Sequence, residues 1–231
     1  MNEDRSAETA YHEHTSMVRI MLRPMGSPLP MGFLGLAVAT TGFSALQLGL
    51  VPEDETRIVA LAALLVTVPL MALASVFGVL ARDPVASTSM GVLGGIWALL
   101  AVVKMTTEPG TQSTALGLLL IVAGMAVLVP IVGALQKVMV AIVMIGSGLR
   151  FSLTGLSEMT SSPVAETAAG AAGLVLAFLA LYTALALELE DSKGYAVLPL
   201  FRHGDASLAT RHDIGDQTKG LARETGVRAE L

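Results

Sequence analysis

Six long runs with few or no charged residues constrain this sequence more than any other feature. A helix needs about 20 apolar residues to cross the roughly 30 Å hydrocarbon core of a bilayer. Five runs meet this requirement without a charge, and a further one contains Arg150. The sequence therefore predicts an all-α, polytopic membrane protein, a bundle of six transmembrane helices. The expected spans are 31–51, 58–81, 84–103, 114–135, 138–157 and 167–187.

The charged residues lie almost entirely outside these runs. They make up 14% of the 231 residues, against about 25% in ordinary soluble domains. A charge at the centre of a bilayer costs at least a few kcal/mol, so the membrane imposes this distribution. The short connectors leave no room for a soluble domain between spans. We expect an N-terminal tail at 1–26, a membrane domain at 27–200, and a C-terminal tail at 201–231 that is disordered beyond about Gly204.

Lysine and arginine residues near the span ends indicate the orientation, because short cytoplasmic loops are enriched in them. One side of the predicted bundle has two such residues, Arg57 and Lys104. The other side has six: Arg19, Arg23, Arg82, Lys137, Lys193 and Arg202. We therefore expect a multi-pass protein of the cell (plasma) membrane with both termini in the cytoplasm.

Several classes of function are disfavoured by composition. The sequence has no cysteine, which removes disulfides, thiolate nucleophiles and zinc ribbons. A net charge of -5 without a basic stripe argues against a nucleic-acid partner. No G-x-S-x-G, H-E-x-x-H or P-loop pattern is present. We predict no enzyme activity, no metal site and no cofactor.

Arg150 is the most informative single residue. A guanidinium inside a span is costly and needs a carboxylate, carbonyl groups or water around it. A rise of 1.5 Å per residue places it about 18 Å along the helix from Val138. The side chain either snorkels to the outer headgroups or lines a path for an anionic solute. In the second interpretation, Lys104 and Arg57 assist at the same outer mouth.

Other polar, small and proline residues inside the spans favour helix packing, a solute path, or both. Thr40 and Thr41 offer hydroxyl groups to a pore, or bond back to their own helix. Runs of small residues at 91–95 and 168–173 indicate close approach of helices in lipid. Pro69 and Pro130 lie within spans and predict kinks rather than breaks.

Three stretches resemble one family of membrane proteins. SPLPMGFLGLAVATTG, which begins at Ser27, is similar to the N-P-A-P-L-G-L segment and Thr-rich helix of the acetate uptake transporter family (SatP/YaaH-like acetate and succinate transporters). STSMGVLGGIWALL resembles its aromatic third span, and Tyr182 with the later GYAVLPL resembles its closing motif. The resemblance runs to about Leu200. Ser27, Leu29 and Met71 depart from the usual Asn, Ala and Gln.

This resemblance implies a transporter or channel for acetate, a related short-chain monocarboxylate or succinate, working as an anion channel or a proton-coupled carrier. Its partners would be a small carboxylate anion, with a proton in the carrier case, and the lipid bilayer. It also implies a homo-oligomer, a hexamer by resemblance, with a pore in each subunit. The expected substrate path holds Thr40, Thr41, Lys104 and Arg150. The expected constriction is formed by Leu36, Leu93 and either Ile145 or Gly146, with a leucine where the family often has an aromatic ring.

A second class of function stays open from the residues alone. The chain could be a non-transporting membrane scaffold or sensor. In that case the acidic segment 188–191 or the C-terminal tail would face the partner.

Overall fold

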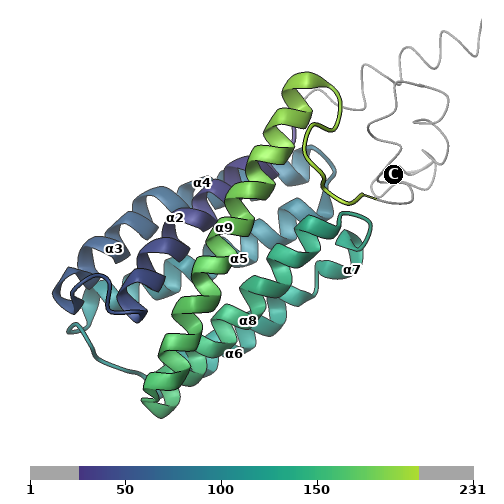
Figure 1. Ribbon diagram of the computed structural model, residues 1–231. Helices are drawn as coiled ribbons and strands as arrows, with labels where there is room; N and C mark the ends of the chain where they lie inside the picture. The colour runs from purple at the N-terminus through teal and green to yellow at the C-terminus, as the bar shows by residue number, and fades with distance from the viewer. Residues whose placement is uncertain (1–25, 203–231) are drawn as a thin grey trace, which may run out of the picture.

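The computed structural model describes residues 26–202, and the predicted tails at 1–25 and 203–231 lie outside the described residues. The regular secondary structure of this part of the chain is all helical, apart from one isolated bridge between Lys137 and Arg202. The helices run alongside one another, with α9 between α2 and α8 (Figure 1). Their bounds are α2 Leu29–Gln47, η1 Glu53–Glu55, α3 Thr56–Ala62, η2 Ala63–Thr67, α4 Val68–Leu80, α5 Pro84–Thr106, α6 Thr114–Leu128, α7 Ile131–Ala134, α8 Val138–Thr160 and α9 Pro163–Lys193.

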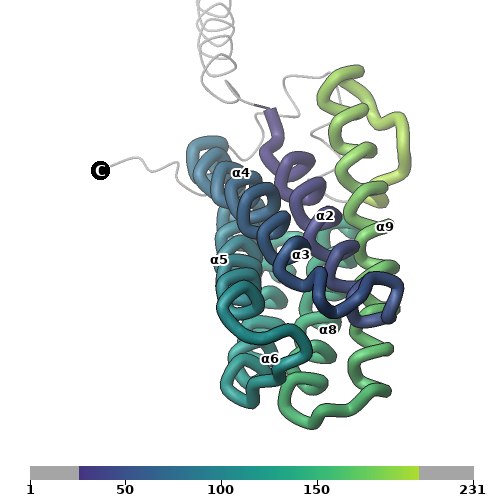
Figure 2. Tube along the Cα trace, turned by 90° about the vertical axis from the view of Figure 1, so that its left-hand side faces the viewer, coloured from purple at the N-terminus to yellow at the C-terminus, as the bar shows by residue number. Residues whose placement is uncertain are grey.

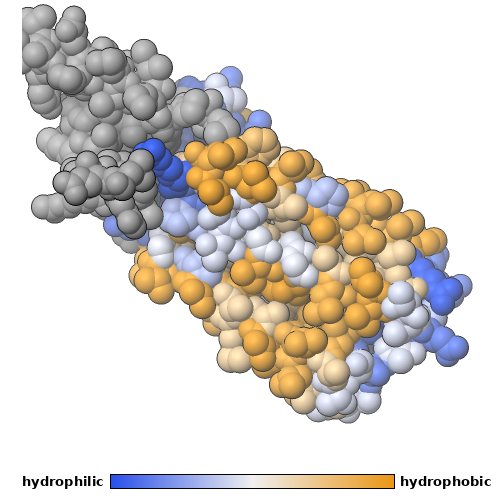
Figure 3. Space-filling view, turned by 180° about the vertical axis from the view of Figure 1, so that it is seen from behind, coloured by the Kyte–Doolittle hydropathy of each residue, from blue (hydrophilic) through white to orange (hydrophobic). Residues whose placement is uncertain are grey.

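Six helical stretches within the described residues are long and apolar enough to cross a membrane, which confirms the predicted fold class. Apolar side chains cover much of the side of the bundle, and hydrophilic residues gather toward its ends (Figure 3). The helix bounds differ from the expected spans by a few residues at most ends, and α2 and α9 show two clear cases. α2 ends at Gln47 because the chain turns at Gly49, where φ is 67°. α9 runs from Pro163 to Lys193, several residues beyond the predicted span at both ends.

The connectors contain the residues that start the next helix. The Asp83 carboxylate accepts a hydrogen bond from the Ala86 N–H at 3.0 Å and caps α5. Ser113 caps α6 in the same way, and Ser162 caps α9. Each side chain pairs a backbone N–H that a helix start would otherwise leave free. The sequence thus marks the three helix starts locally.

The two prolines inside spans have different consequences. Before Pro69 the helix widens into the π-turn η2, and the helix continues without a break. At Pro130 the helical stretch runs on to Ala134, but Val129 and Pro130, whose dihedral angles stay in the helical region, separate α6 from α7. Proline removes a backbone N–H and crowds the preceding turn. A π-turn accommodates this defect in the first case, and a short interruption does so in the second.

Close packing holds the helices in pairs, most clearly α2 with α9, α4 with α5, and α6 with α8 (Figure 2). In the last pair, a Cβ added at Gly117 would lie 2.5 Å from the Gly155 carbonyl oxygen. The predicted small-residue contacts are also present. Gly94 packs on Met71 of α4, and Gly170 packs on the end of α2. Without a hydrophobic driving force in lipid, such van der Waals contacts hold helices together.

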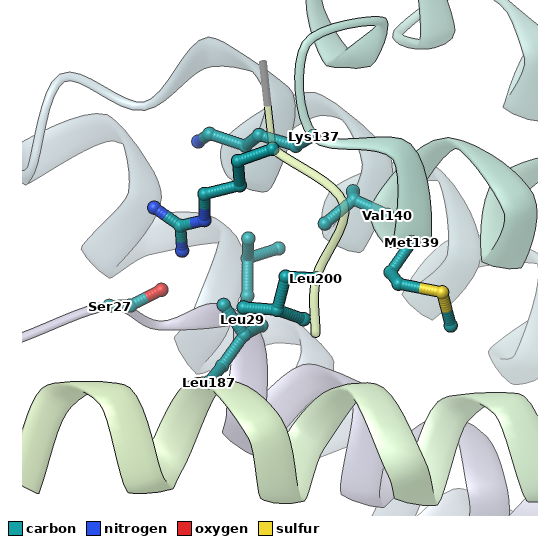
Figure 4. A pocket seen from close by; sticks show the side chains of 8 residues that line it. Ser27, Leu29, Lys137, Met139, Val140, Leu187 and Leu200 are labelled. Carbon is teal, nitrogen blue, oxygen red and sulfur yellow. The ribbon is translucent and has the colours of Figure 1, made fainter. Parts of the chain in front are cut away.

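One end of the bundle is covered by the segment after α9. We name this the closed end; it also carries the connectors 81–83 and 135–137. The chain reverses at Gly194, and Leu200 then lies buried beside Leu29, Leu187 and Val140 around a hollow of about 30 Å³ (Figure 4). Arg202 pairs with Glu190 at 2.6 Å.

The acidic segment that could have faced a partner is partly engaged within the chain. Glu190 forms the ion pair with Arg202, and Asp191 accepts a hydrogen bond from the Ser27 N–H at 2.9 Å. Glu188 is exposed. The contacts of this segment therefore contribute to the closed end of the bundle, and no observation on the described residues favours a scaffold or sensor function.

Candidate functional site

The opposite end of the bundle holds a cavity of about 130 Å³. We name this the cavity end; it carries the connectors 48–55, 107–113 and 161–162. The cavity is formed by the last turns of α2, α5 and α8, the start of α9, and the connectors around them. Its lining residues are Phe43, Leu46, Gln47, Glu53, Thr56, Leu100, Lys104, Gly110, Gln112, Arg150, Thr154, Ser157, Glu158 and Glu166.

Arg150 lies at the bottom of this cavity and is 0% exposed. Its guanidinium carbon lies 5.1 Å from the centre of the Trp97 ring and 5.7 Å from that of Phe151. All three guanidinium nitrogens lack a hydrogen-bond partner among residues 26–202. The side chain therefore points into the bundle instead of snorkelling to the headgroups. Ring contacts attract the cation, but they do not replace the hydrogen bonds that a buried guanidinium needs.

Neutral donors surround the same place. The Thr40 and Ser44 hydroxyls on α2 and the Trp97 Nε1–H on α5 are buried without a hydrogen-bond partner in the described part of the chain. The geometry at Gly173 of α9 shows that the Ser44 hydroxyl lies close to the Arg150 guanidinium. A Cβ added there would lie 2.0 Å from Ser44 Oγ and 2.7 Å from Arg150 Nε. Buried polar groups in proteins are almost always hydrogen-bonded, so several unsatisfied donors in one place indicate a binding site for an acceptor.

The rim of the cavity is acidic. The Lys104 ammonium lies 2.5 Å from a Glu158 carboxylate oxygen and donates a further hydrogen bond to the Thr111 carbonyl at 3.0 Å. Glu158 also accepts from the Ser113 N–H at 3.0 Å. Together the lining residues include two cations and three carboxylates. The Lys104 charge is thus countered locally, and the charge that remains near the mouth is negative.

This arrangement differs from the cationic outer mouth that the sequence suggested. Arg57 is exposed and does not line the cavity, although Lys104 does. The pairing of Lys104 with Glu158 joins α5 to α8, which only the tertiary fold brings together. The free cation of the cavity is therefore the buried Arg150 at its bottom.

Mostly apolar side chains fill the bundle beyond Arg150, and the buried hydroxyls of Thr67, Ser89 and Ser147 there donate to backbone carbonyls. Leu36 and Leu93 are both 0% exposed and belong to one buried apolar cluster. On α2 the buried residues Leu36, Thr40 and Ser44 recur every four positions, so they share one face. At 1.5 Å per residue, Leu36 lies about 12 Å further along the axis than Ser44. A polar half and an apolar half thus follow each other along the interior.

The other predicted site residues lie on different faces. Thr41 is exposed, unlike its neighbour Thr40, because successive residues of a helix point about 100° apart. Ile145 is 52% exposed on the outside of the bundle. Gly146 is half-buried against Leu176 of α9. The neighbouring residues of α8 that are fully buried at this level are Val143, Met144 and Ser147.

Several residues that line the cavity or lie beside it had no predicted role. Ser44 follows Thr40 by four residues, and Thr154 and Glu158 follow Arg150 by four and eight. This spacing places them on the same helix faces as residues that were identified. Glu53 and Glu166 gave no such signal, because their positions near the cavity depend on how α2, η1 and α9 meet.

Comparison with known proteins agrees with the fold and the motifs. A solved structure described as that of the bacterial acetate channel SatP has a TM-score of 0.67 to this chain at 21% sequence identity. The match covers 76% of this chain and 98% of that channel. A search of curated proteins found no match. Residues 12–203 match the family described as GPR1/FUN34/yaaH, as the motif resemblance predicted. The chain is therefore a six-span membrane protein that belongs to the GPR1/FUN34/yaaH family.

Proposed function

We propose that this protein passes acetate or a related small carboxylate across a membrane. The observation that carries the proposal is the buried guanidinium of Arg150, which has no hydrogen-bond partner among the described residues and lies at the bottom of a cavity. A carboxylate would give it the bidentate pairing that an arginine fork favours. The neighbouring Trp97 N–H and Ser44 hydroxyl would donate to the same anion. The solved structure with the same fold is described as that of an acetate channel, which supports this class of solute.

The apolar layer beyond Arg150 would act as the narrow part of the path. Leu36 and Leu93 are fully buried there within the apolar cluster. A short carboxylate could cross such a layer with its methyl group in apolar contact, either protonated or with little water. Met144, which is also fully buried, takes the place of Ile145 in this proposed constriction. The Arg150 cavity would thus bind the solute before the constriction admits it.

The cavity end would face outward. Arg82, Lys137, Lys193 and Arg202 lie near the closed end, whereas Arg57 and Lys104 lie near the cavity end. Positive residues are enriched on the cytoplasmic side, so the closed end would face the cytoplasm of a plasma membrane. We also propose a homo-oligomer, a hexamer by family resemblance, in which every subunit has its own path. Membership in this family supports transport rather than catalysis.

Uptake of labelled acetate into proteoliposomes tests the proposal. Arg150→Gln removes the charge and should lower the rate about tenfold or more, since hydrogen bonds to charged groups contribute about 1.5–3 kcal/mol. Arg150→Lys keeps the charge but lacks the forked arrangement of donors. Its uptake rate should therefore fall between those of the parent and Arg150→Gln. Arg57→Gln, at an exposed position of the same end, is the matched control and should keep the parental rate.

Thermal unfolding in detergent separates a transport role from a structural one. An uncompensated buried charge destabilises a fold, so Arg150→Gln should unfold at the same temperature as the parent or higher. Reduced uptake with retained stability would support a solute-binding role. Parental uptake by correctly inserted Arg150→Gln would rule it out.

A further inference from the structure

We propose that the cavity admits carboxylates with a single negative charge and excludes dianions, with Glu53 and Glu166 as the residues that set this preference. The inference rests on the proposed function and narrows its substrate class. It separates acetate and other monocarboxylates from succinate at neutral pH. Three features of the path act in this direction: the single cation at the bottom, the carboxylates at the rim and the apolar layer beyond.

The bottom of the cavity offers one cation. Arg150 is positioned for one carboxylate, and the other unsatisfied groups around it, including Thr40, Ser44 and Trp97, are neutral. Lys104 is the second cation of the lining, and it is already paired with Glu158. A second carboxylate on the same solute would therefore be desolvated without a counter-charge. Burial of an unpaired charge costs several kcal/mol, so the site favours solutes with one carboxylate.

The rim adds a charge barrier above this site. Among the lining residues, Glu53 is exposed and Glu166 is half-buried, whereas Arg150 is fully buried, so the two carboxylates lie nearer the solvent than the guanidinium does. Within the described residues, Glu158 is countered by Lys104, and neither Glu53 nor Glu166 has an ion pair. A solute must pass these two carboxylates to reach Arg150. Coulomb repulsion scales with the charge of the solute, so a dianion is repelled twice as strongly as a monoanion.

The apolar layer acts in the same direction. Beyond Arg150 the interior around Leu36 and Leu93 is apolar. A monocarboxylate becomes neutral by taking up one proton, whereas a dicarboxylate with one proton still carries a charge. Each charge left on the solute raises the cost of crossing a region of low dielectric constant. All three parts of the path therefore discriminate by the number of charges on the solute.

The test compares initial rates of acetate and succinate uptake into proteoliposomes at pH 7.5, where succinate is a dianion. The parent should take up acetate at least about tenfold faster, because one additional unpaired charge costs more than 1.4 kcal/mol. Glu166→Gln should raise the ratio of succinate to acetate uptake about threefold, and the double variant with Glu53→Gln should raise it further. Acidification to a pH at which succinate holds one proton should raise the same ratio in the parent.

Two exposed carboxylates of the same end provide matched controls. Glu55→Gln and Glu108→Gln remove the same charge from residues that do not line the cavity. Neither should change the ratio, since the surface charges are screened by salt. Equal uptake of both solutes by the parent at pH 7.5 would overturn the inference. So would a ratio that Glu166→Gln and the double variant leave unchanged, or that the control variants raise equally. Absence of acetate uptake by the parent would instead refute the proposed function itself.

Discussion

Gly173 is the position where a single methyl group should disturb the Arg150 site most directly. A Cβ at this position would lie 2.0 Å from Ser44 Oγ, 2.7 Å from Arg150 Nε and 3.3 Å from Arg150 Cδ. Real Cβ atoms essentially never approach within 3.0 Å of such atoms, so Ser44 Oγ must move by about 1 Å and Arg150 Nε by a few tenths of an ångström. The Ser44 hydroxyl can rotate away. Arg150 has less freedom, because its guanidinium lies against the Trp97 and Phe151 rings.

The magnitude of the effect follows from two opposing contributions. Overpacking of a well-packed interior costs about 1–3 kcal/mol, and replacement of glycine by alanine inside a helix contributes about 1 kcal/mol of stability. Gly173→Ala should therefore be less stable than the parent by about 0–2 kcal/mol. Displacement of Arg150 acts on solute binding without that compensation, so acetate uptake should fall about tenfold, which corresponds to about 1.4 kcal/mol.

Gly95→Ala is the control for this experiment. It introduces the same methyl group at a helical glycine where, apart from the chain neighbours and the backbone of its own helix, no atom lies within 4 Å of the new Cβ. Uptake by Gly95→Ala should match the parent in proteoliposomes of equal protein content. If Gly173→Ala also transports at the parental rate while remaining folded, the position of Arg150 does not matter for transport, and the account of the site fails.

Two further predictions concern the apolar layer and the closed end. Leu93→Trp should block acetate uptake although the variant still inserts into the membrane, because Leu93 is fully buried and an indole ring would fill the narrow part of the path. Undiminished flux through the inserted variant would count against this constriction. At the closed end, burial alone would raise the pKa of the Asp83 carboxyl, but the Lys137 charge and hydrogen bonds from Lys137 and the Ala86 and Val85 N–H groups hold it below its usual value. The folded state therefore binds fewer protons than the unfolded state near this pKa, and the stabilisation from Asp83 is complete at neutral pH and lost below about pH 4. Asp83→Asn, which still caps α5, should lower stability by about 1 kcal/mol at pH 7, and the difference from the parent should shrink in unfolding measurements below pH 4; a difference that is constant with pH would contradict the assignment.

Hydropathy and charge placement predicted the six helices because the bilayer imposes both on each span separately. The connector residues Asp83, Ser113 and Ser162 also start their helices through local hydrogen bonds. Such features depend on neighbours in the chain. They can be identified before any tertiary contact is known.

The site was only partly predictable, because the sequence of a transmembrane helix does not show which face of the helix points into the bundle. Thr40 and Thr41 are equivalent in composition, and the packing of α2 buries the first and exposes the second. For Arg150, the polar residues Ser147, Thr154 and Glu158 on the same face of α8 indicate the inward direction. The pairing of Lys104 with Glu158 could not be predicted in this way, because the partners come from helices that are distant in sequence.

Binding of a carboxylate by Arg150 can be tested by a direct distance measurement. Solid-state NMR of the protein in lipid, with ¹³C at the carboxyl of acetate and ¹⁵N in arginine, reports their separation. The account predicts a dipolar coupling that corresponds to about 4 Å, as expected for a bidentate pair, and its loss in Arg150→Gln but not in Arg57→Gln. Absence of such a coupling at saturating acetate, or a coupling that survives in Arg150→Gln, would contradict the account.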